Sequence, residues 1–382
     1  MTTQDKFADI RPYHPAEVPP AVARMIKNPQ FQIAVDYLFD KRESQQIYQD
    51  LTKVKTGFEF QKVFMYKAIN RVLELTSDGL SLSNVSRLRN NGPSVLLSNH
   101  RDILLDSAML QVVLVDQDME TSEITFGSNL MFNDFIIDFG KVNRMFTVFR
   151  EGNPREMLAH SMHLSDYMHH TIQDKKVSAW IAQRKGRTKD GLDKTDTAVL
   201  KMLSMFDRKN PVEAFLSLNI LPIAVSYEWE PCDFAKIREL YISKDRKFIK
   251  KPGEDFSSVI HGIIKPKGKI NLAFGRPVNE FINKNRSSLD KHNIHQEVAA
   301  YIDAQIYENY KLYATNYYAY DCLNGSKEHA DKYHQETEKQ MAQRLEDLYD
   351  LLDDRSEEIK KLYLSLYAAP VVQKKTLAQV MV

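Results

Sequence analysis

The chain has 382 residues, of which 43% are hydrophobic and 27% are charged, ordinary values for a globular protein that buries a core. The net charge of +1 excludes a global field that would recruit nucleic acid, so no nucleic-acid partner is expected and any anion site must be local. Two cysteines argue against a disulfide scaffold and for a reducing compartment. The sequence shows no secretory signal and no apolar run of the ~18–20 residues that span a membrane. We therefore expect a cytoplasmic protein, with peripheral contact to the inner face of the cell membrane still allowed.

In chain order, the first predicted region is a helical N-terminal extension over residues 1–89. Residues 1–20 contain four prolines and are expected to be extended. Apolar spacing from residue 21 to about residue 75 predicts helices that cover a core. Contact of this apolar stripe with lipid is the alternative. The turn sequence Asn90-Asn91-Gly92-Pro93 marks the end of the extension.

An α/β domain is predicted over residues 90–281, because short apolar or β-branched runs alternate there with helical segments. The predicted strands lie around residues 95–97, 124–127, 145–150, 176–183, 219–231 and 267–278. The predicted helices lie at residues 103–115, within 128–140, and at 154–173 and 197–206. This alternation predicts an α/β fold with a mixed, mainly parallel sheet flanked by helices.

A helical C-terminal extension is predicted over residues 282–382. Residues 326–366 are rich in Glu, Lys, Gln and Leu and contain neither Gly nor Pro, which predicts long amphipathic helices. The tail from Pro370 is apolar with two lysines. We expect this tail to be packed or frayed, and contact with a membrane is the alternative.

The segment around His100 carries the most distinctive chemistry. A buried strand, Val95–Leu97, is followed by Ser98-Asn99, which can cap the helix predicted from Ile103. His100, Arg101 and Asp102 lie at this junction, and Asp106 lies about one turn further on. A histidine and a carboxylate at a strand-to-helix junction, where backbone N–H groups point at the same place, can form a general base.

A protein-kinase motif offers a competing interpretation of the same segment. His100-Arg101-Asp102, followed by Asp138-Phe139-Gly140, mimics the catalytic loop and the magnesium-binding motif of kinases. The other kinase motifs are missing, because position 107 is Ser instead of Asn and no glycine-rich loop precedes it. A phosphotransferase is therefore a remote alternative.

Acyl transfer to a hydroxyl needs a base, a carboxylate that orients it, N–H donors for the oxyanion and fixed positive charge for a phosphate. Four sequence blocks in order carry such groups: Asn99-His100 with its carboxylate, FGKVNRMFTVFRE with Arg150, WIAQRKGRTKDG with a Gly-Arg loop, and LPIAVSYEW with Pro222. Together these blocks resemble the motifs of the glycerolipid acyltransferases, the family of lysophosphatidic acid and glycerol-3-phosphate acyltransferases. The resemblance covers about residues 95–280.

The resemblance implies transfer of a fatty acyl group from acyl-CoA or acyl-carrier protein to a hydroxyl of a glycerol-phosphate or lysophospholipid acceptor. No cofactor and no metal is implied. His100 would be the general base, and N–H groups at the start of the 103–115 helix could serve the oxyanion. A lipid product of this kind fits a protein that lies on the membrane surface. The residues implied in binding the acceptor are Arg101, Arg150, Lys185, Gly186, Arg187, Thr188, Lys189 and Pro222.

The chain departs from the family pattern at two places. The usual four-residue gap after the histidine ends at Leu105, so the orienting carboxylate is Asp106, or alternatively Asp102. In the third block, Lys185 stands where the family has glutamate and Arg187 comes one residue early. These departures motivate a second hypothesis, a lipid-binding protein of the same fold with weakened catalysis.

The histidines of the 154–173 helix are also candidate metal ligands. His160, His163, His169 and His170 have spacings that could place two or three ligands on one helix face. One helix alone does not complete a site, so we expect a polar helix surface there and no metal.

Overall fold

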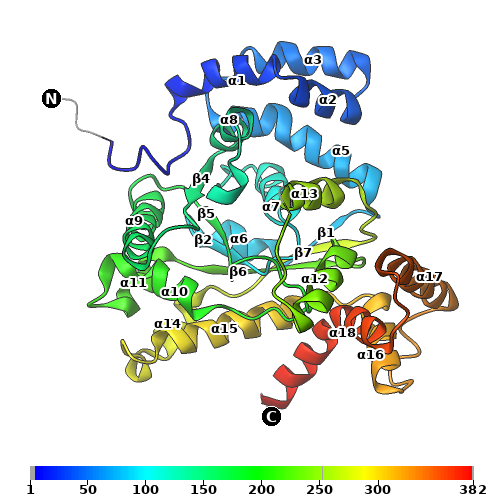
Figure 1. Cartoon of the computed structure of the whole chain (residues 1–382). Coiled ribbons are helices and arrows are strands. Elements are labelled where there is room, and N and C mark those ends of the chain that lie inside the picture. The colour runs from blue at the N-terminus through cyan, green and yellow to red at the C-terminus, as the bar shows by residue number, and fades with distance from the viewer. Residues whose placement is uncertain (1–4, 252, 381–382) are drawn as a thin grey trace.

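A mixed β-sheet forms the centre of the protein (Figure 1). The computed structural model describes residues 5–251 and 253–380. Within these residues the sheet has seven strands in the order β1-β7-β6-β2-β5-β3-β4. The strands are β1 (Leu80–Ser83), β2 (Val95–Ser98), β3 (Glu123–Gly127), β4 (Met145–Val148), β5 (Ala179–Ala182), β6 (Leu221–Tyr227) and β7 (Ile270–Phe274).

The strand directions create one functional edge. Strands β6, β2, β5, β3 and β4 run parallel, whereas β7 is antiparallel to β6 and β1 is parallel to β7. The sheet is thus mixed and mainly parallel, as the sequence predicts. Because the carboxyl ends of five parallel strands lie at the same edge, the loops that follow β2, β3, β4, β5 and β6 gather there.

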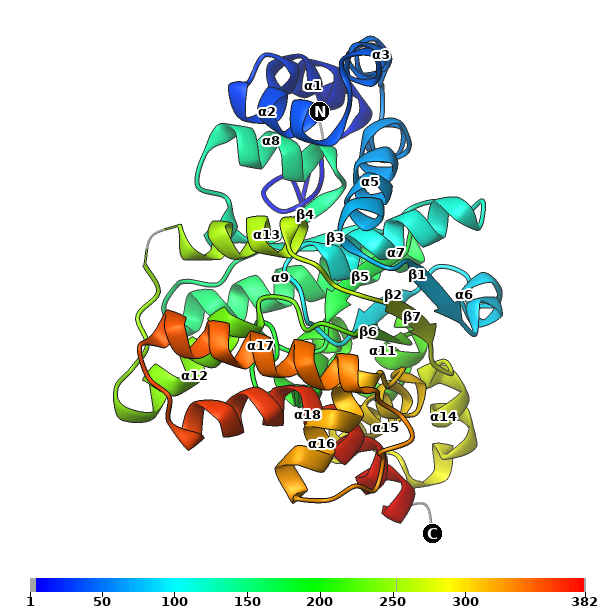
Figure 2. The same cartoon turned by 90° about the vertical axis from the view of Figure 1, so that its right-hand side faces the viewer.

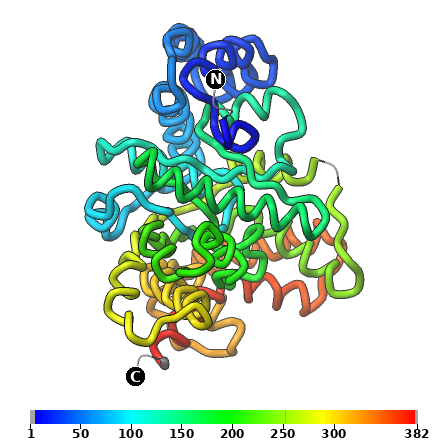
Figure 3. The backbone as a smooth tube through the Cα atoms, turned by 90° about the vertical axis from the view of Figure 1, so that its left-hand side faces the viewer, coloured from blue at the N-terminus to red at the C-terminus, as the bar shows by residue number. Residues whose placement is uncertain are grey.

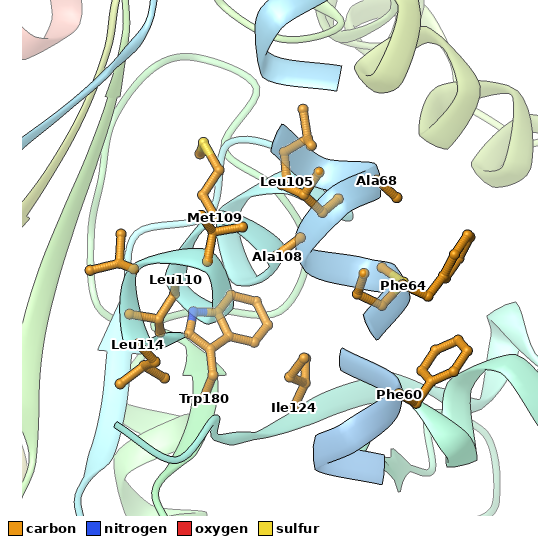
Figure 4. Close-up of a cluster of buried hydrophobic side chains, with 14 of the residues drawn as sticks. Phe60, Phe64, Ala68, Leu105, Ala108, Met109, Leu110, Leu114, Ile124 and Trp180 are labelled. Carbon is orange, nitrogen blue, oxygen red and sulfur yellow. The ribbon is translucent and has the colours of Figure 1, made fainter. Parts of the chain in front are cut away.

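Each face of the sheet is covered by its own layer of helices, because successive side chains of a strand point to opposite faces. Leu96, Trp180 and Ile223 join the hydrophobic core on one face, part of which Figure 4 shows. Leu97 and Ala224 join the core on the other face. The first layer contains α1 (Val18–Ile26), α2 (Pro29–Leu38), α3 (Lys41–Leu51), α4 (Gly57–Phe60), a π-helical turn (Gln61–Met65), α5 (Tyr66–Thr76), α6 (Val85–Asn91), α7 (Leu105–Asp116) and α8 (Asp134–Val142). The second contains α9 (Pro154–Gln173), α10 (Thr197–Leu203), α11 (Pro211–Leu218), α14 (Val278–Lys284) and α15 (Ile294–Asn309).

The remaining helices form a third core beside the sheet. Side chains of α12 (Asp233–Asp245), α16 (Ala314–Asn324), α17 (Gln335–Leu352) and α18 (Glu357–Val380) pack together there. Figures 1 and 3 show the N-terminal helices at one end of the molecule and these C-terminal helices toward the other. The helix not yet described, α13 (Glu254–Ile264), lies between α8 and α12 in Figure 2. Short 3₁₀ turns occur at Pro15–Glu17, Ser128–Leu130, Met205–Asp207 and Arg286–Ser288.

The structure contains elements that were not predicted from the sequence. Strand β1 pairs with β7, although it falls in the range 1–89 assigned to a helical extension. Its four residues, LSLS, are too short to give a clear periodicity. Helices α11, α12 and α13 were not predicted either.

The C-terminal tail is helical and packed as far as it is described. Pro370 lies inside α18, Val371 is 2% exposed, and the Gln373 amide donates to the carbonyl of Asp193. These contacts favour the packed alternative for this tail. None of the helices described is both long enough and apolar enough to cross a membrane.

Candidate active site

The loop between β2 and α7 holds His100 at the carboxyl edge of the sheet. Just before the histidine, the buried Asn99 side chain bonds the backbone of β6 in the way a neighbouring strand would. Its amide oxygen accepts from the Val225 N–H (2.7 Å), and its amide nitrogen donates to the Val225 carbonyl (3.0 Å). The backbone of Thr188, in the basic loop after β5, donates to the carbonyl of His100 (2.9 Å). Strand β6 on one side and the loop after β5 on the other therefore hold the backbone at Asn99 and His100 in place.

His100 and Asp106 form a buried pair. Nδ1 of His100 lies 3.0 Å from Oδ2 of Asp106, and the side chains are 11% and 0% exposed. The same oxygen accepts the N–H groups of Arg101 (2.7 Å) and Asp102 (2.9 Å). A carboxylate held in this way favours the tautomer with its proton on Nδ1. Nε2, which makes no hydrogen bond to the described residues, is then free to accept a proton.

Tyr227 supports this pair from the end of β6, a role that was not predicted from the sequence. Its hydroxyl donates to Oδ1 of Asp106 (2.8 Å), and both side chains are buried. Replacing Tyr227 with phenylalanine leaves this oxygen without a donor and should lower the free energy of unfolding by about 1–3 kcal/mol. Urea unfolding measures the change. Tyr66→Phe is the matched control, because its partner Asp116 is exposed and can turn to water; an equal loss in both variants would contradict the role of Tyr227.

Asp102, the alternative partner of His100, bonds backbone N–H groups at the start of α7 instead of the imidazole. Its Oδ1 accepts the N–H groups of Leu104 (2.9 Å) and Leu105 (2.8 Å), so it caps α7. The cap expected from Ser98-Asn99 is therefore supplied by Asp102. The N–H groups of Leu104 and Leu105 are therefore bonded to Asp102 and are not available to an oxyanion. Burial raises the pKa of Asp102, and the charge of Asp106 acts in the same direction.

Arg101 is not placed to bind a substrate, which corrects the prediction from sequence. Its guanidinium is 1% exposed and bonds Asp193 (2.5 Å) and Glu230 (2.9 Å). Lys236 donates to Glu230 (2.6 Å) and to the Arg101 carbonyl (2.7 Å). Two cations and two carboxylates thus form a neutral buried cluster directly behind His100. The sequence gives no signal of this cluster, because its partners come from three separate segments.

The basic loop after β5 contains residues of two kinds. Thr188 is buried and bonded to Asp190 and Leu192, and Lys189 pairs with Glu239, so neither is free for a substrate. Gly186 has a φ of +75°, which favours glycine, and Lys185 beside it is exposed. Arg187 is different, because its Nη1 is buried and has no hydrogen-bond partner. Such a group is suited to an anion.

Arg150 is the second cation that lacks a partner. It follows β4, and its guanidinium lies over Gly127, where a Cβ would come within 2.7 Å of Nε. Among the described residues its side chain forms no ion pair, while burial lowers its pKa and the charge of Asp255 opposes this shift. Asp255 also lines a pocket together with Arg187. Both arginines thus lie in the neighbourhood of Asp255 at the start of α13.

The other candidate residues are structural. Pro222 is buried within β6 opposite Leu97 of β2, below the carboxyl edge, so the sequence-based assignment of Pro222 to the substrate is not supported by its position. Asp138 of the kinase-like motif is bound by Arg24 (2.7 Å) and Tyr13 (2.8 Å), which occupies the carboxylate that would hold magnesium. Within the described residues, no group of three or more His, Cys, Asp or Glu side chains is arranged to hold a metal ion.

The fold and site define an α/β protein with a His–Asp pair at the carboxyl edge of its sheet, where two arginines form no ion pair with any residue that the structure describes. No protein-family model matches the sequence, and no curated protein matches it. Among solved structures, a similar chain is the 1-acyl-sn-glycerophosphate (LPA) acyltransferase PlsC from Thermotoga maritima, with a TM-score of 0.40 and 13% sequence identity. The alignment covers 77% of this chain and 94% of that chain.

Proposed function

We propose that this protein is an O-acyltransferase that moves a fatty acyl group from a thioester donor to a hydroxyl of a phosphorylated acceptor. The donor is acyl-CoA or acyl-carrier protein, and the acceptor is a glycerol-phosphate or a lysophospholipid. The observation that carries the proposal is the His100–Asp106 pair, with Nε2 free, at the same sheet edge as Arg150 and Arg187. The proposal assigns residues 90–281 to the acyltransferase domain and places the protein at the cytoplasmic face of a membrane.

The proposed mechanism is a direct transfer. Nε2 of His100 takes the hydroxyl proton while the hydroxyl oxygen attacks the thioester carbonyl. Asp106 stabilises the imidazolium that forms. The C–S bond then breaks, the thiolate leaves with the proton from His100, and the acyl ester is the product. Neither a covalent acyl-enzyme nor a cofactor takes part in this sequence.

The test is an assay with labelled acyl-CoA and acyl-carrier protein, each offered to glycerol 3-phosphate and to lysophosphatidic acid side by side. Labelled product that extracts into organic solvent with one acceptor supports the proposal and identifies the acceptor class. Binding of donor and acceptor without turnover would instead indicate the lipid-binding alternative. Magnesium-dependent nucleotide binding would indicate a phosphotransferase.

Arg187→Ala should mainly raise KM for the phosphorylated acceptor, by about 10- to 100-fold, because it removes charge-assisted hydrogen bonds to the phosphate. Steady-state kinetics at fixed donor concentration measures this change. Arg184→Ala is the matched control from the same loop, since its guanidinium already donates to the Leu192 carbonyl. An unchanged KM in the Arg187 variant would show that this loop is solvated and does not bind the acceptor.

A further inference from the structure

Helix α13 exposes several of its large apolar side chains. A surface helix normally buries its large apolar side chains. In α13 the buried positions are Ser258 and Gly262, whereas Phe256, Ile260 and Ile264 are 40%, 38% and 40% exposed. These three residues follow each other at intervals of four and form one outward stripe. Ile263 of the same helix packs against the core, and Phe256 contacts the ring of Phe132, which is itself 58% exposed. The stripe and Phe132 thus leave an apolar surface that a bilayer could bury.

The inner side of α13 covers the loop that carries His100. A Cβ placed on Gly262 would lie 2.3 Å from Oδ2 of Asp102, so only glycine allows the helix to sit this close. One turn earlier, the Cys232 thiol donates to the Ser258 carbonyl (3.3 Å). Beneath this cover, the His100 side chain is 11% exposed. With so little exposed surface, the His100 ring is poorly accessible to a bulky lipid acceptor.

The segment before α13 is strongly basic. Arg246, Lys247, Lys250 and Lys251 are all exposed, and Ile249 between them is 80% exposed. Within the described residues only Lys250 of these four forms an ion pair, with Asp255. Exposed apolar side chains next to clustered cations are the combination that binds an anionic bilayer surface.

The two ends of α13 are held differently. At its C-terminal end, the buried Lys267 ammonium donates to the carbonyls of Ile263 (3.2 Å) and Lys265 (2.8 Å) and to the Thr76 hydroxyl (2.7 Å), which ties this end to α5. At the N-terminal end, Gly253 has a φ of +82°, and Glu254 and Asp255 form ion pairs at the surface. The Asn129 amide also donates to Asp255 (3.2 Å), and Phe256 contacts the exposed Phe132 ring. Surface ion pairs contribute little stability, so this end is the easier one to lift.

We propose that α13 and residues 246–251 form a membrane-docking lid over His100. The outward stripe and the four cations bind an anionic bilayer, and binding lifts the N-terminal end of α13 from the loop at Asp102. This inference rests on the proposed function, because it assumes that the acceptor reaches His100 from the bilayer. It assigns the membrane contact to α13 instead of the N-terminal helices or the C-terminal tail.

The docking surface is tested by flotation of the full-length protein with vesicles of phosphatidylcholine, alone or mixed with anionic phosphatidylglycerol. Wild type should bind the anionic vesicles. The affinity of the triple variant Phe256→Ser, Ile260→Ser, Ile264→Ser for these vesicles should be lower by a factor of about ten or more. Two matched controls replace other exposed apolar residues, Leu351→Ser on α17 and Ile33→Ser with Tyr37→Ser on α2. Undiminished binding by the triple variant, or a greater loss in the α2 variant, would overturn the assignment.

The lid is tested without any assay of acyl transfer. Diethyl pyrocarbonate modifies accessible imidazoles, and peptide mass spectrometry reports His100 separately from the other histidines. His100 should react slowly in solution and several-fold faster when anionic vesicles are added, whereas His292, which is exposed, should react equally in both. No effect of vesicles on His100 would overturn the lid. These two experiments do not need turnover. The lid can therefore be disproved while the proposed acyltransferase function holds, and the acyltransferase function can be disproved while the lid holds.

Discussion

Replacing His100 with alanine is expected to lower kcat for acyl transfer by about 10²- to 10⁴-fold, the usual contribution of a positioned general base. The reason is specific to Nε2, which is the group free to take the hydroxyl proton once Nδ1 is bonded to Asp106. The variant should still fold, because Asp106 keeps three other donors, the N–H groups of Arg101 and Asp102 and the Tyr227 hydroxyl. Labelled acyl-CoA turnover measures the loss, and thermal unfolding checks the fold.

The matched control for this prediction is His292→Ala, which makes the same change at an exposed position. Its activity and stability should equal those of wild type. If the His100 variant is folded and retains full activity, the assignment of the base is wrong, whatever the state of the lid.

Replacing Arg101 with methionine should lower the free energy of unfolding by about 3–5 kcal/mol. The substitution keeps the bulk of the side chain but leaves Asp193 and Glu230, which are 1% and 4% exposed, with one cation fewer between them. Removing one partner from a buried ionic cluster costs far more than the net contribution of the cluster, because an unbalanced charge stays behind in a poorly solvated site. Urea unfolding followed by circular dichroism gives the value.

Arg276→Met is the control for the Arg101 variant. Arg276 pairs with Glu308 at 3.4 Å, and both side chains are about half exposed, so the loss there should be at most about 1 kcal/mol. A loss in the Arg101 variant no greater than in this control would mean that the cluster behind His100 contributes nothing to stability.

The strand and helix pattern of the central region follows from local sequence. Alternating apolar runs and helical periodicity predicted β2 to β7 and helices such as α7 and α9, because burial on one or two faces leaves a regular spacing in the chain. Strand β1 could not be predicted in this way, because its four residues are half polar and lie at the sheet edge. Helix α13 is a different case, since its apolar spacing is helical but three of its large apolar side chains are exposed.

In the candidate site, too, some contacts could be predicted from the sequence and others could not. The contact of His100 with Asp106 spans six positions and lies within one loop and the first turn of a helix, so the sequence made Asp106 a candidate beside Asp102, and the structure shows which of the two contacts the ring. The roles of the arginines were not predictable. The sequence does not distinguish Arg101, Arg150 and Arg187. In the structure Arg101 is neutralised by two carboxylates, whereas Arg150 and Arg187 form no ion pair with the described residues.

The sequence by itself thus determined the alternation of strands and helices and placed His100 near two candidate carboxylates, because both features depend on neighbours within a few residues. The tertiary structure alone decided which arginines form ion pairs and which helix packs against the loop that carries His100. The two carboxylates that bind Arg101 lie 92 and 129 positions away, and the cover over Asp102 comes from Gly262. Contacts between such distant segments depend on how the sheet and its helices pack, which no local pattern encodes.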